Sequence, residues 1–167
     1  MITAKDPQVP ASFKIINKLV ILQLVAENPK PLATIQEEII ALTTKDVPQM
    51  LELTKMTNPG PFAERTIEFS NYKGIFDGEQ LVAMAGHRMH PGQYIEISAI
   101  CTHPDHLGKG YGSALTLYHA HQILAKGNIP FLHVRQGNEN AIRLYQKSGF
   151  VIRSEMHLNV FQQSDQV

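Results

Sequence analysis

The sequence predicts a single domain of mixed α/β class, in which helices cover a mixed sheet. Three observations support this prediction. A meander of three strands is expected between helical segments, and two β–α steps follow it toward the C-terminus. The 167 residues are enough for one domain with a hydrophobic core, and the hydrophobic (43%) and charged (18%) contents are ordinary for a globular protein.

The first half of the chain predicts strands followed by two helices. Residues 13–25 are rich in Ile, Leu and Val and are expected to form one or two strands, and a further short strand is expected at 38–42. Helical spacing of apolar side chains predicts a helix over residues 47–56. The sequence Asn-Pro-Gly-Pro at 58–61 ends that helix because proline lacks a backbone donor, and a second short helix is expected at 62–69.

The second half predicts a meander of three strands and then alternating helices and strands. The meander covers residues 73–76, 81–89 and 94–102, and Asp77-Gly78 is a strong signal for its first hairpin. The remaining elements are, in order, a helix at 113–126, a strand at 131–135, a helix at 138–148 and a strand at 151–160.

Charge and cysteine content limit the partners and the compartment. Lys plus Arg (15) balances Asp plus Glu (15), so the sequence gives no electrostatic argument for binding nucleic acid or a membrane surface. The single cysteine, Cys101, cannot form an internal disulfide, and no apolar run is long enough to span a bilayer. The start of the chain has no signal-peptide pattern. We therefore expect a cytoplasmic protein, and the spacing of its eight histidines predicts no metal site.

Three glycines at alternate positions, Gly108, Gly110 and Gly112, lie between an expected strand and the long helix. Glycines at such a junction let the backbone approach a ligand, and the N–H groups at a helix N-terminus attract anions. The pattern therefore predicts a diphosphate site. It matches neither the phosphate loop Gly-x-x-x-x-Gly-Lys-Ser/Thr nor the dinucleotide fingerprint Gly-x-Gly-x-x-Gly.

Two motifs in sequence order resemble those of the GNAT family (Gcn5-related N-acetyltransferases). The segment from Leu107 to Gly112 resembles the family's acetyl-coenzyme A loop, Gln/Arg-x-x-Gly-x-Gly/Ala. The segment from Asn138 to Phe150 resembles its second motif, Asn-x-x-Ala-x-x-Leu-Tyr-x-x-x-Gly-Phe. Residues 96–104 further look like the FR47-like branch of that superfamily, and the whole resemblance spans residues 38–160.

This resemblance implies an architecture and a division of the chain. The implied fold is a central mixed, mostly antiparallel twisted sheet of about six or seven strands, flanked by about four helices. The implied division is an N-terminal extension with one or two strands (1–37), a GNAT acetyltransferase domain (38–162) and a flexible tail (163–167).

The resemblance also implies acetyl-coenzyme A as co-substrate, with no metal. The residues implied in binding it belong to the strand before the loop, the loop itself and the last helix: Ile100, Cys101, Thr102, Leu107, Gly108, Lys109, Gly110, Tyr111, Gly112, Ser113, Asn138 and Tyr145. Leu107 stands where the family has Gln or Arg. Its backbone N–H is retained, and we expect either that Lys109 supplies the phosphate charge or that affinity is lower. Asn138 is equally suited to cap the following helix.

The implied chemistry is attack by a neutral amine on a thioester, with a proton donor for the departing thiolate. By resemblance, Tyr145 is that general acid, and its alternative role is packing in the core. Glu96 and His133 are the two candidate bases, and some members of the family need none. Strand alternation groups Glu96 with Ile100 and Thr102, and partial burial is expected to raise the pKa of Glu96. An unperturbed imidazole titrates near neutrality, which suits the same task.

We therefore expect an N-acetyltransferase that acetylates a primary amine by direct attack in a ternary complex, as a monomer or homodimer. A non-catalytic acyl-CoA-binding or sensing module of the same fold is the alternative, and a nucleotide-phosphate binder is a third possibility. The acceptor is a small molecule or a peptide or protein amine, expected between residues 58–61, the following helix and the turn at 89–93. A buried strand cysteine is usually inert, which disfavours covalent acylation of Cys101.

Overall fold

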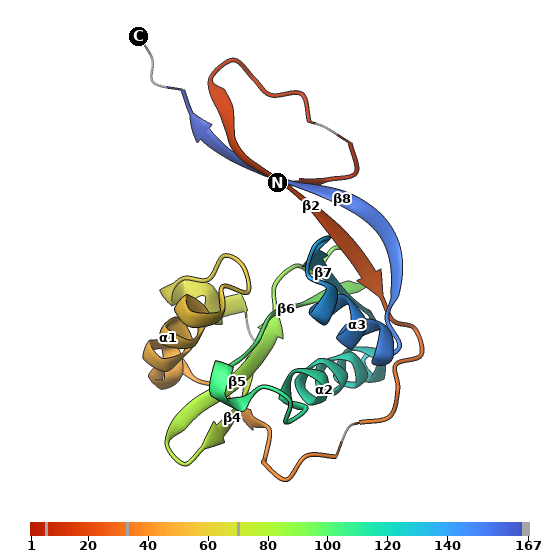
Figure 1. The fold of residues 1–167 in the computed structure, drawn as a ribbon. Coiled ribbons are helices and arrows are strands. Elements are labelled where there is room, and N and C mark those ends of the chain that lie inside the picture. Colours follow the sequence, from red (N-terminus) through yellow and green to blue (C-terminus); the bar gives the residue numbers. More distant parts are fainter. Residues whose placement is uncertain (6, 33, 70, 165–167) are drawn as a thin grey trace.

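The protein is built around one sheet of eight strands (Figure 1). The computed structural model describes residues 1–5, 7–32, 34–69 and 71–164. Within them the strands follow the order β1-β8-β2-β7-β6-β5-β4-β3, and each neighbouring pair is antiparallel except β6 with β7. The strands are β1 (Ile2–Thr3), β2 (Phe13–Val25), β3 (Ile40–Ala41), β4 (Lys73–Asp77), β5 (Gln80–His87), β6 (Tyr94–Thr102), β7 (Ile129–Arg135) and β8 (Val151–Gln163). The expected mixed, mostly antiparallel sheet is confirmed, and the two-residue edge strands β1 and β3 bring the number to eight.

Helices cover both faces of this sheet (Figure 1). They are α1 (Val47–Thr57), α2 (Tyr111–Ala125), α3 (Glu139–Lys147) and three 3-10 segments, η1 (Thr44–Asp46), η2 (Glu64–Phe69) and η3 (Pro104–His106). α2 and α3 share one buried apolar cluster with the sheet, and α1 packs on the opposite face with a second cluster. We call these two sides the α2 face and the α1 face. No helix in the described part of the chain is long and apolar enough to cross a membrane.

The first long strand, β2, lies in the interior of the sheet, between β7 and β8. It pairs with β7 from Ile21 to Val25 and with β8 over its whole length. Leu24 is fully buried in the core. The described part of residues 1–37 thus holds two strands, and the division into an extension and a domain stays a prediction. Gln163 ends β8, and residues 165–167 of the expected tail lie outside the described residues.

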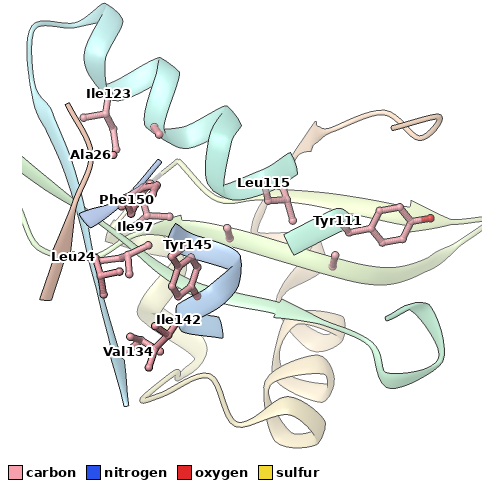
Figure 2. Close-up of a cluster of buried hydrophobic side chains, with 14 of the residues drawn as sticks. Leu24, Ala26, Ile97, Tyr111, Leu115, Ile123, Val134, Ile142, Tyr145 and Phe150 are labelled. Atoms are coloured by element: carbon pink, nitrogen blue, oxygen red, sulfur yellow. The ribbon is translucent and has the colours of Figure 1, made fainter. Parts of the chain in front are cut away.

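The larger apolar cluster lies between the sheet and the helices α2 and α3 (Figure 2). Leu24, Ile97 and Leu132 bring it together from β2, β6 and β7, and all three are buried to within 1% of full burial. The side chains of Tyr111 and Tyr145 reach it from the first turn of α2 and from α3. Both motif helices are therefore anchored to the sheet by apolar contacts, which fixes their termini beside the central strands.

Strand β6 contains a β-bulge at Ala99, a non-glycine residue in the left-handed region (φ 52°). The pairing with β5 passes from Ser98 opposite Gly86 to Cys101 opposite Met84, so two residues of β6 face one of β5. The bulge reverses the alternation beyond it. The predicted grouping of Ile100 and Thr102 with Glu96 is therefore wrong, because it assumed an unbroken strand. Cys101 instead shares the α1 face with Glu96.

Strands β6 and β7 are paired only at one end. Their parallel register runs from Tyr94 opposite Ile129 to Glu96 opposite Phe131 and stops there. Beyond the bulge, residues 100–102 and 133–135 are no longer paired with one another. The two strands therefore diverge in the middle of the sheet, next to the helices that carry both motifs.

Two buried histidines, His87 at the end of β5 and His119 on α2, form a hydrogen-bonded pair on the α2 face. His119 Nδ1 lies 3.1 Å from His87 Nε2, and His119 Nε2 lies 3.2 Å from the carbonyl oxygen of Ala85. A carbonyl oxygen only accepts, so His119 donates from Nε2, accepts at Nδ1, and receives the Nε2 proton of His87. Burial lowers the pKa of His87 to about 4 and that of His119 to about 3.

Candidate active site

A cavity of about 310 Å³ occupies the gap where β6 and β7 diverge. Residues 100–102 of β6 form one side, and His133, Val134 and Arg135 of β7 form the other. Tyr145 of α3 lines it from the α2 face, and residues 57–61 after α1 line it from the α1 face. The cavity therefore connects the two faces of the sheet through its centre.

The glycine loop leads into α2 with its backbone donors free. Gly108 (φ 81°) and Gly110 (φ 85°) both adopt the left-handed conformation that favours glycine, and Gly110 caps the helix without a side-chain bond. The first helical hydrogen bond runs from the N–H of Ala114 to the carbonyl of Gly110, at 2.9 Å. Among the described residues, no partner is found for the backbone N–H groups of residues 108–113. Six consecutive donors at a helix N-terminus suit a diphosphate.

Leu107 contributes less to this loop than the sequence predicts. Its N–H, expected to face the ligand, donates to the carbonyl of Pro104 at 3.3 Å. Its side chain is 68% exposed. Lys109 folds back over the loop, with Nζ 3.2 Å from His106 Nδ1 and 5.9 Å above the ring of Tyr111. The ammonium group therefore lies beside the free donors, on an exposed side chain.

Tyr111 anchors the loop through its side chain. The ring is buried, and its hydroxyl donates to the Glu37 carboxylate at 2.5 Å. This hydrogen bond raises the pKa of Tyr111 to about 12 and lowers that of Glu37. Of the polar groups of Tyr111, its backbone N–H is free for a ligand, whereas its hydroxyl is already bonded to Glu37. Sequence reasoning missed Glu37, because 74 positions separate it from Tyr111 and no local pattern joins them.

Tyr145 lines the cavity and is only 8% exposed. Figure 2 shows its ring among the buried side chains of the larger apolar cluster. Its ring packs against Phe150 with centroids 6.3 Å apart, and its hydroxyl makes no hydrogen bond to any residue that the structure describes. Burial raises the pKa of Tyr145 well above its usual value, so the hydroxyl stays protonated at neutral pH. The residue therefore packs in the core and lines the cavity, and its hydroxyl has no partner among the described residues.

Glu96 is fully buried and held by two partners. Its carboxylate accepts from Arg88 Nε at 2.9 Å and lies 2.8 Å from His133 Nδ1. Burial alone would raise the pKa of Glu96, but the hydrogen bonds from His133 and Arg88 outweigh it and lower the pKa. The expected rise in this pKa is therefore wrong. Arg88 was missed because it follows β5, and only strand pairing brings it to Glu96.

His133 lines the cavity and touches Glu96 with one ring nitrogen and Gln23 with the other. Its Nε2 lies 3.2 Å from the amide nitrogen of Gln23, which pairs directly opposite it between β7 and β2. The two candidate bases are thus in contact. Sequence reasoning missed Gln23, which comes from the first long strand, 110 positions away.

Cys101 and Asn138 occupy opposite sides of the cavity. Burial raises the pKa of the Cys101 thiol to about 12, so the thiolate needed for covalent acylation is scarce. Asn138 caps α3 by accepting from the N–H of Ala141 at 3.2 Å, while its amide group remains on the cavity wall. The capping role is therefore present, and it leaves the side-chain N–H groups available.

Four features together define a GNAT fold. They are a bulged central strand, a neighbouring strand that diverges from it, a helix that begins at a glycine loop beside the gap, and a tyrosine on the next helix. The chain matches the family described as FR47-like protein over residues 72–158. It belongs to this family, the FR47-like branch of the GNAT superfamily of acetyltransferases.

Known structures and sequences agree with this assignment. A GNAT-family protein from Novosphingobium aromaticivorans is 33% identical, with a TM-score of 0.90, covering 98% of this chain and 73% of that one. The ribosomal-protein-S18-alanine N-acetyltransferase of Escherichia coli shares the fold at 21% identity (TM-score 0.61; 79% of this chain, 99% of that one). The PaiA N-acetyltransferase of Thermoplasma acidophilum, solved in complex with coenzyme A, shares the fold at 18% identity (TM-score 0.60; 75% of this chain, 100% of that one). An uncharacterised protein from Mycobacterium leprae is 33% identical over 146 residues. The match covers 79% of this chain and only 40% of the length of the Mycobacterium protein.

Proposed function

We propose that this protein is an acetyl-CoA-dependent N-acetyltransferase that acetylates a primary amine by direct attack. The observation that carries the proposal is the cavity between β6 and β7, which Tyr145 lines. The free backbone donors at the start of α2 lie next to it, because Gly112 packs near Thr102 of the cavity lining. The coenzyme A complex of the Thermoplasma relative supports the choice of co-substrate.

The residues of this chain fit coenzyme A. The N–H groups of residues 108–113 suit the diphosphate, and Lys109 adds a positive charge beside them. Residues 100–102, which β7 leaves unpaired, offer backbone groups to the amides of the pantetheine arm, as a neighbouring strand would. The free amide group of Asn138 faces the same cavity. The bound thioester supplies an electrophilic carbonyl carbon and a thiolate leaving group.

The two faces of the sheet give the two substrates separate approaches. The glycine loop, Asn138 and Tyr145 lie on the α2 face, and residues 57–61 with Arg88 lie on the α1 face. The acceptor amine, from a small molecule, a peptide or a protein, is expected at the α1 face. The predicted involvement of residues 58–61 agrees with the lining of the cavity, whereas the turn at 89–93 contributes Pro91 to a separate pocket.

Acetyl transfer needs a proton at sulfur when the carbon–sulfur bond breaks. The Tyr145 hydroxyl is protonated, and among the described residues it has no competing hydrogen-bond acceptor, so it can donate to the departing thiolate. Attack by the neutral amine forms the carbon–nitrogen bond. Tyr145 then regains a proton from the amine nitrogen, so the net step moves one proton from nitrogen to sulfur. An acceptor that arrives as an ammonium ion must first lose one further proton to a base.

The test is release of free thiol from acetyl-CoA over a panel of amines. We expect Tyr145→Phe to lower kcat about 100-fold or more with little change in the affinity for acetyl-CoA. Tyr118→Phe, a half-buried tyrosine of α2 outside this cavity, is the matched control and should stay near wild type. Binding of acetyl-CoA without thiol release on any amine would favour the non-catalytic sensing module, and competition by ATP would favour a nucleotide binder.

A further inference from the structure

Five polar side chains form a continuous chain of hydrogen bonds across the α1 face of the sheet. In order they are Arg88, Glu96, His133, Gln23 and Arg153. Arg88 directly follows β5, and the others come from β6, β7, β2 and β8. The His133 ring is the central link, and its side chain is 6% exposed, at the wall of the cavity. Glu96 and His133 at its centre are buried, and buried polar groups are costly unless their hydrogen bonds are satisfied, so the direction of each bond is informative.

On one side of His133, the carboxylate of Glu96 determines which ring nitrogen carries the proton. Glu96 accepts from the Arg88 guanidinium, which lowers the pKa of Glu96 and keeps it ionised. A carboxylate only accepts hydrogen bonds, so the 2.8 Å contact with His133 requires a proton on Nδ1. The neutral ring then has its lone pair on Nε2.

The opposite end of the chain leads to the same tautomer independently. A guanidinium only donates, so the atom of the Gln23 amide that lies 2.7 Å from Arg153 must be the oxygen. This orientation turns the NH₂ group of Gln23 toward His133 Nε2, at 3.2 Å, and an NH₂ group needs an acceptor. The register shift of β8 between Ser154 and Ile152 makes Arg153 a bulge residue, and bulges redirect side chains.

We propose that His133 accepts the proton of the acceptor amine through Nε2, and that Glu96 and Gln23, held by Arg88 and Arg153, are positioning residues that fix this tautomer. The inference rests on the proposed function. It assigns the carboxylate of Glu96 the role of orienting His133, and not that of the base.

The proton balance of the step is simple. An ammonium acceptor gives one proton to His133 Nε2, which makes the amine nucleophilic and the ring an imidazolium. The carboxylate of Glu96 then accepts the Nδ1 proton of a positively charged ring, and this contact stabilises the imidazolium. A charged donor binds an imidazole lone pair more strongly than an amide does, so the acceptor displaces the long contact with Gln23. The imidazolium returns its proton to water after the product leaves.

Several charged or titratable groups surround the ring, and the pH dependence must be judged against all of them. They are Glu96 on β6, Arg88 after β5, Arg153 on β8, Arg135 on β7 itself, and Cys101 and Tyr145 across the cavity. Of these groups Glu96 is the one anion, since burial keeps Cys101 and Tyr145 protonated. Removing its charge therefore has a larger effect on an imidazolium than removing any other.

The first experiment measures the tautomer directly, without any substrate. Two-bond ¹H–¹⁵N correlation spectra of the ¹⁵N-histidine-labelled protein distinguish the two tautomers, and the signals lost in His133→Gln identify His133. We expect Nδ1 protonated and Nε2 unprotonated at pH 8. A ring protonated on Nε2 overturns the proposal even if the enzyme proves to be an active acetyltransferase.

The second experiment measures kcat/KM against pH with an amine found active in the thiol-release panel. In Glu96→Gln we expect the acidic limb to move to lower pH by about one unit, because the charge that stabilises the imidazolium is gone. His90→Gln, an exposed histidine outside the cavity, should leave the profile unchanged. A uniform loss at every pH in Glu96→Gln would show a merely structural carboxylate and overturn the proposal. If no amine is active, the proposed function fails, and the tautomer is still decided by the first experiment.

Discussion

The protein contains two hydrogen-bonded histidine chains on opposite faces of the same sheet. On the α2 face, His87 and His119 bond to each other, and their chain ends on a backbone carbonyl. On the α1 face, His133 lies between an ionised carboxylate and an amide, at the wall of a cavity. Burial is similar in both places. The difference is the partner: burial among neutral groups keeps the first pair uncharged, whereas His133 contacts the carboxylate of Glu96.

The largest expected effect separates the two chains by activity. His133→Gln should lower kcat/KM by about 100-fold or more at pH 7, and the deficit should shrink as the pH approaches the pKa of the amine, where the acceptor needs no base. Its thermal unfolding should change little, because glutamine can keep a contact with Glu96. Equal rates for the variant and the wild type at pH 7 would place His133 in the same structural class as His119.

The next effect concerns stability. His119→Leu removes the partner of two buried polar groups, the Nε2 proton of His87 and the carbonyl of Ala85. We expect a loss of about 2–3 kcal/mol in the free energy of unfolding, measured by urea denaturation. Below its own melting temperature the variant should keep kcat/KM within about twofold. A large loss of activity in the folded variant would mean that the two faces are coupled.

The same pair predicts an acid-sensitive fold. Both rings are neutral in the folded protein because their pKa values are lowered to about 4 and about 3, whereas an unfolded histidine titrates near 6.5. The unfolded chain therefore binds more protons between these values, and stability falls as the pH drops below about 6.5. We expect a loss on the order of 1–2 kcal/mol per ring at pH 5, from urea unfolding at several pH values. His119→Leu should flatten this dependence, and an unchanged slope would contradict the assignment.

The smallest expected effect tests the far end of the His133 chain. Arg153→Ala frees the Gln23 amide to rotate, because the guanidinium that fixes its oxygen is gone. Arg153 is exposed, so we expect a roughly two- to fivefold fall in kcat/KM with unchanged stability. Arg143→Ala, which removes an exposed arginine of α3 bonded to Asn140, provides the matched control. Identical kinetics in the two variants would contradict the proposal that Arg153 positions Gln23.

Local patterns predicted much of the fold and part of the candidate site. The bounds of β6 were predicted to the residue, and α2, β7 and α3 within two or three residues, since glycine, proline and capping signals mark their ends. The glycine loop and Tyr145 came from contiguous motifs. Tyr145 lines the cavity, and the loop lies next to it through Gly112 and Thr102. This arrangement follows from the sheet order, because α2 and α3 each follow one of the two diverging strands.

The errors and omissions have a common physical cause. The bulge at Ala99 could not be predicted, since alanine does not favour the left-handed conformation found there. This bulge places Thr102 on the face opposite to the predicted one. The predicted direction of the Glu96 pKa shift was wrong because burial was weighed without the hydrogen bonds from His133 and Arg88. Contacts such as Tyr111 with Glu37 join segments far apart in the chain, and only the strand order brings them together.

The interior position of β2 has a consequence for synthesis. This strand leaves the ribosome well before both of its neighbours, β7 and β8. Until they follow, its two edges have no permanent partner, and long-range pairing of this kind is slow and exposed to misassociation. Gln23, which contacts His133 Nε2, therefore has no partner until β7 has been made, so the nascent chain should depend on chaperones for longer than one whose central strands are neighbours in sequence.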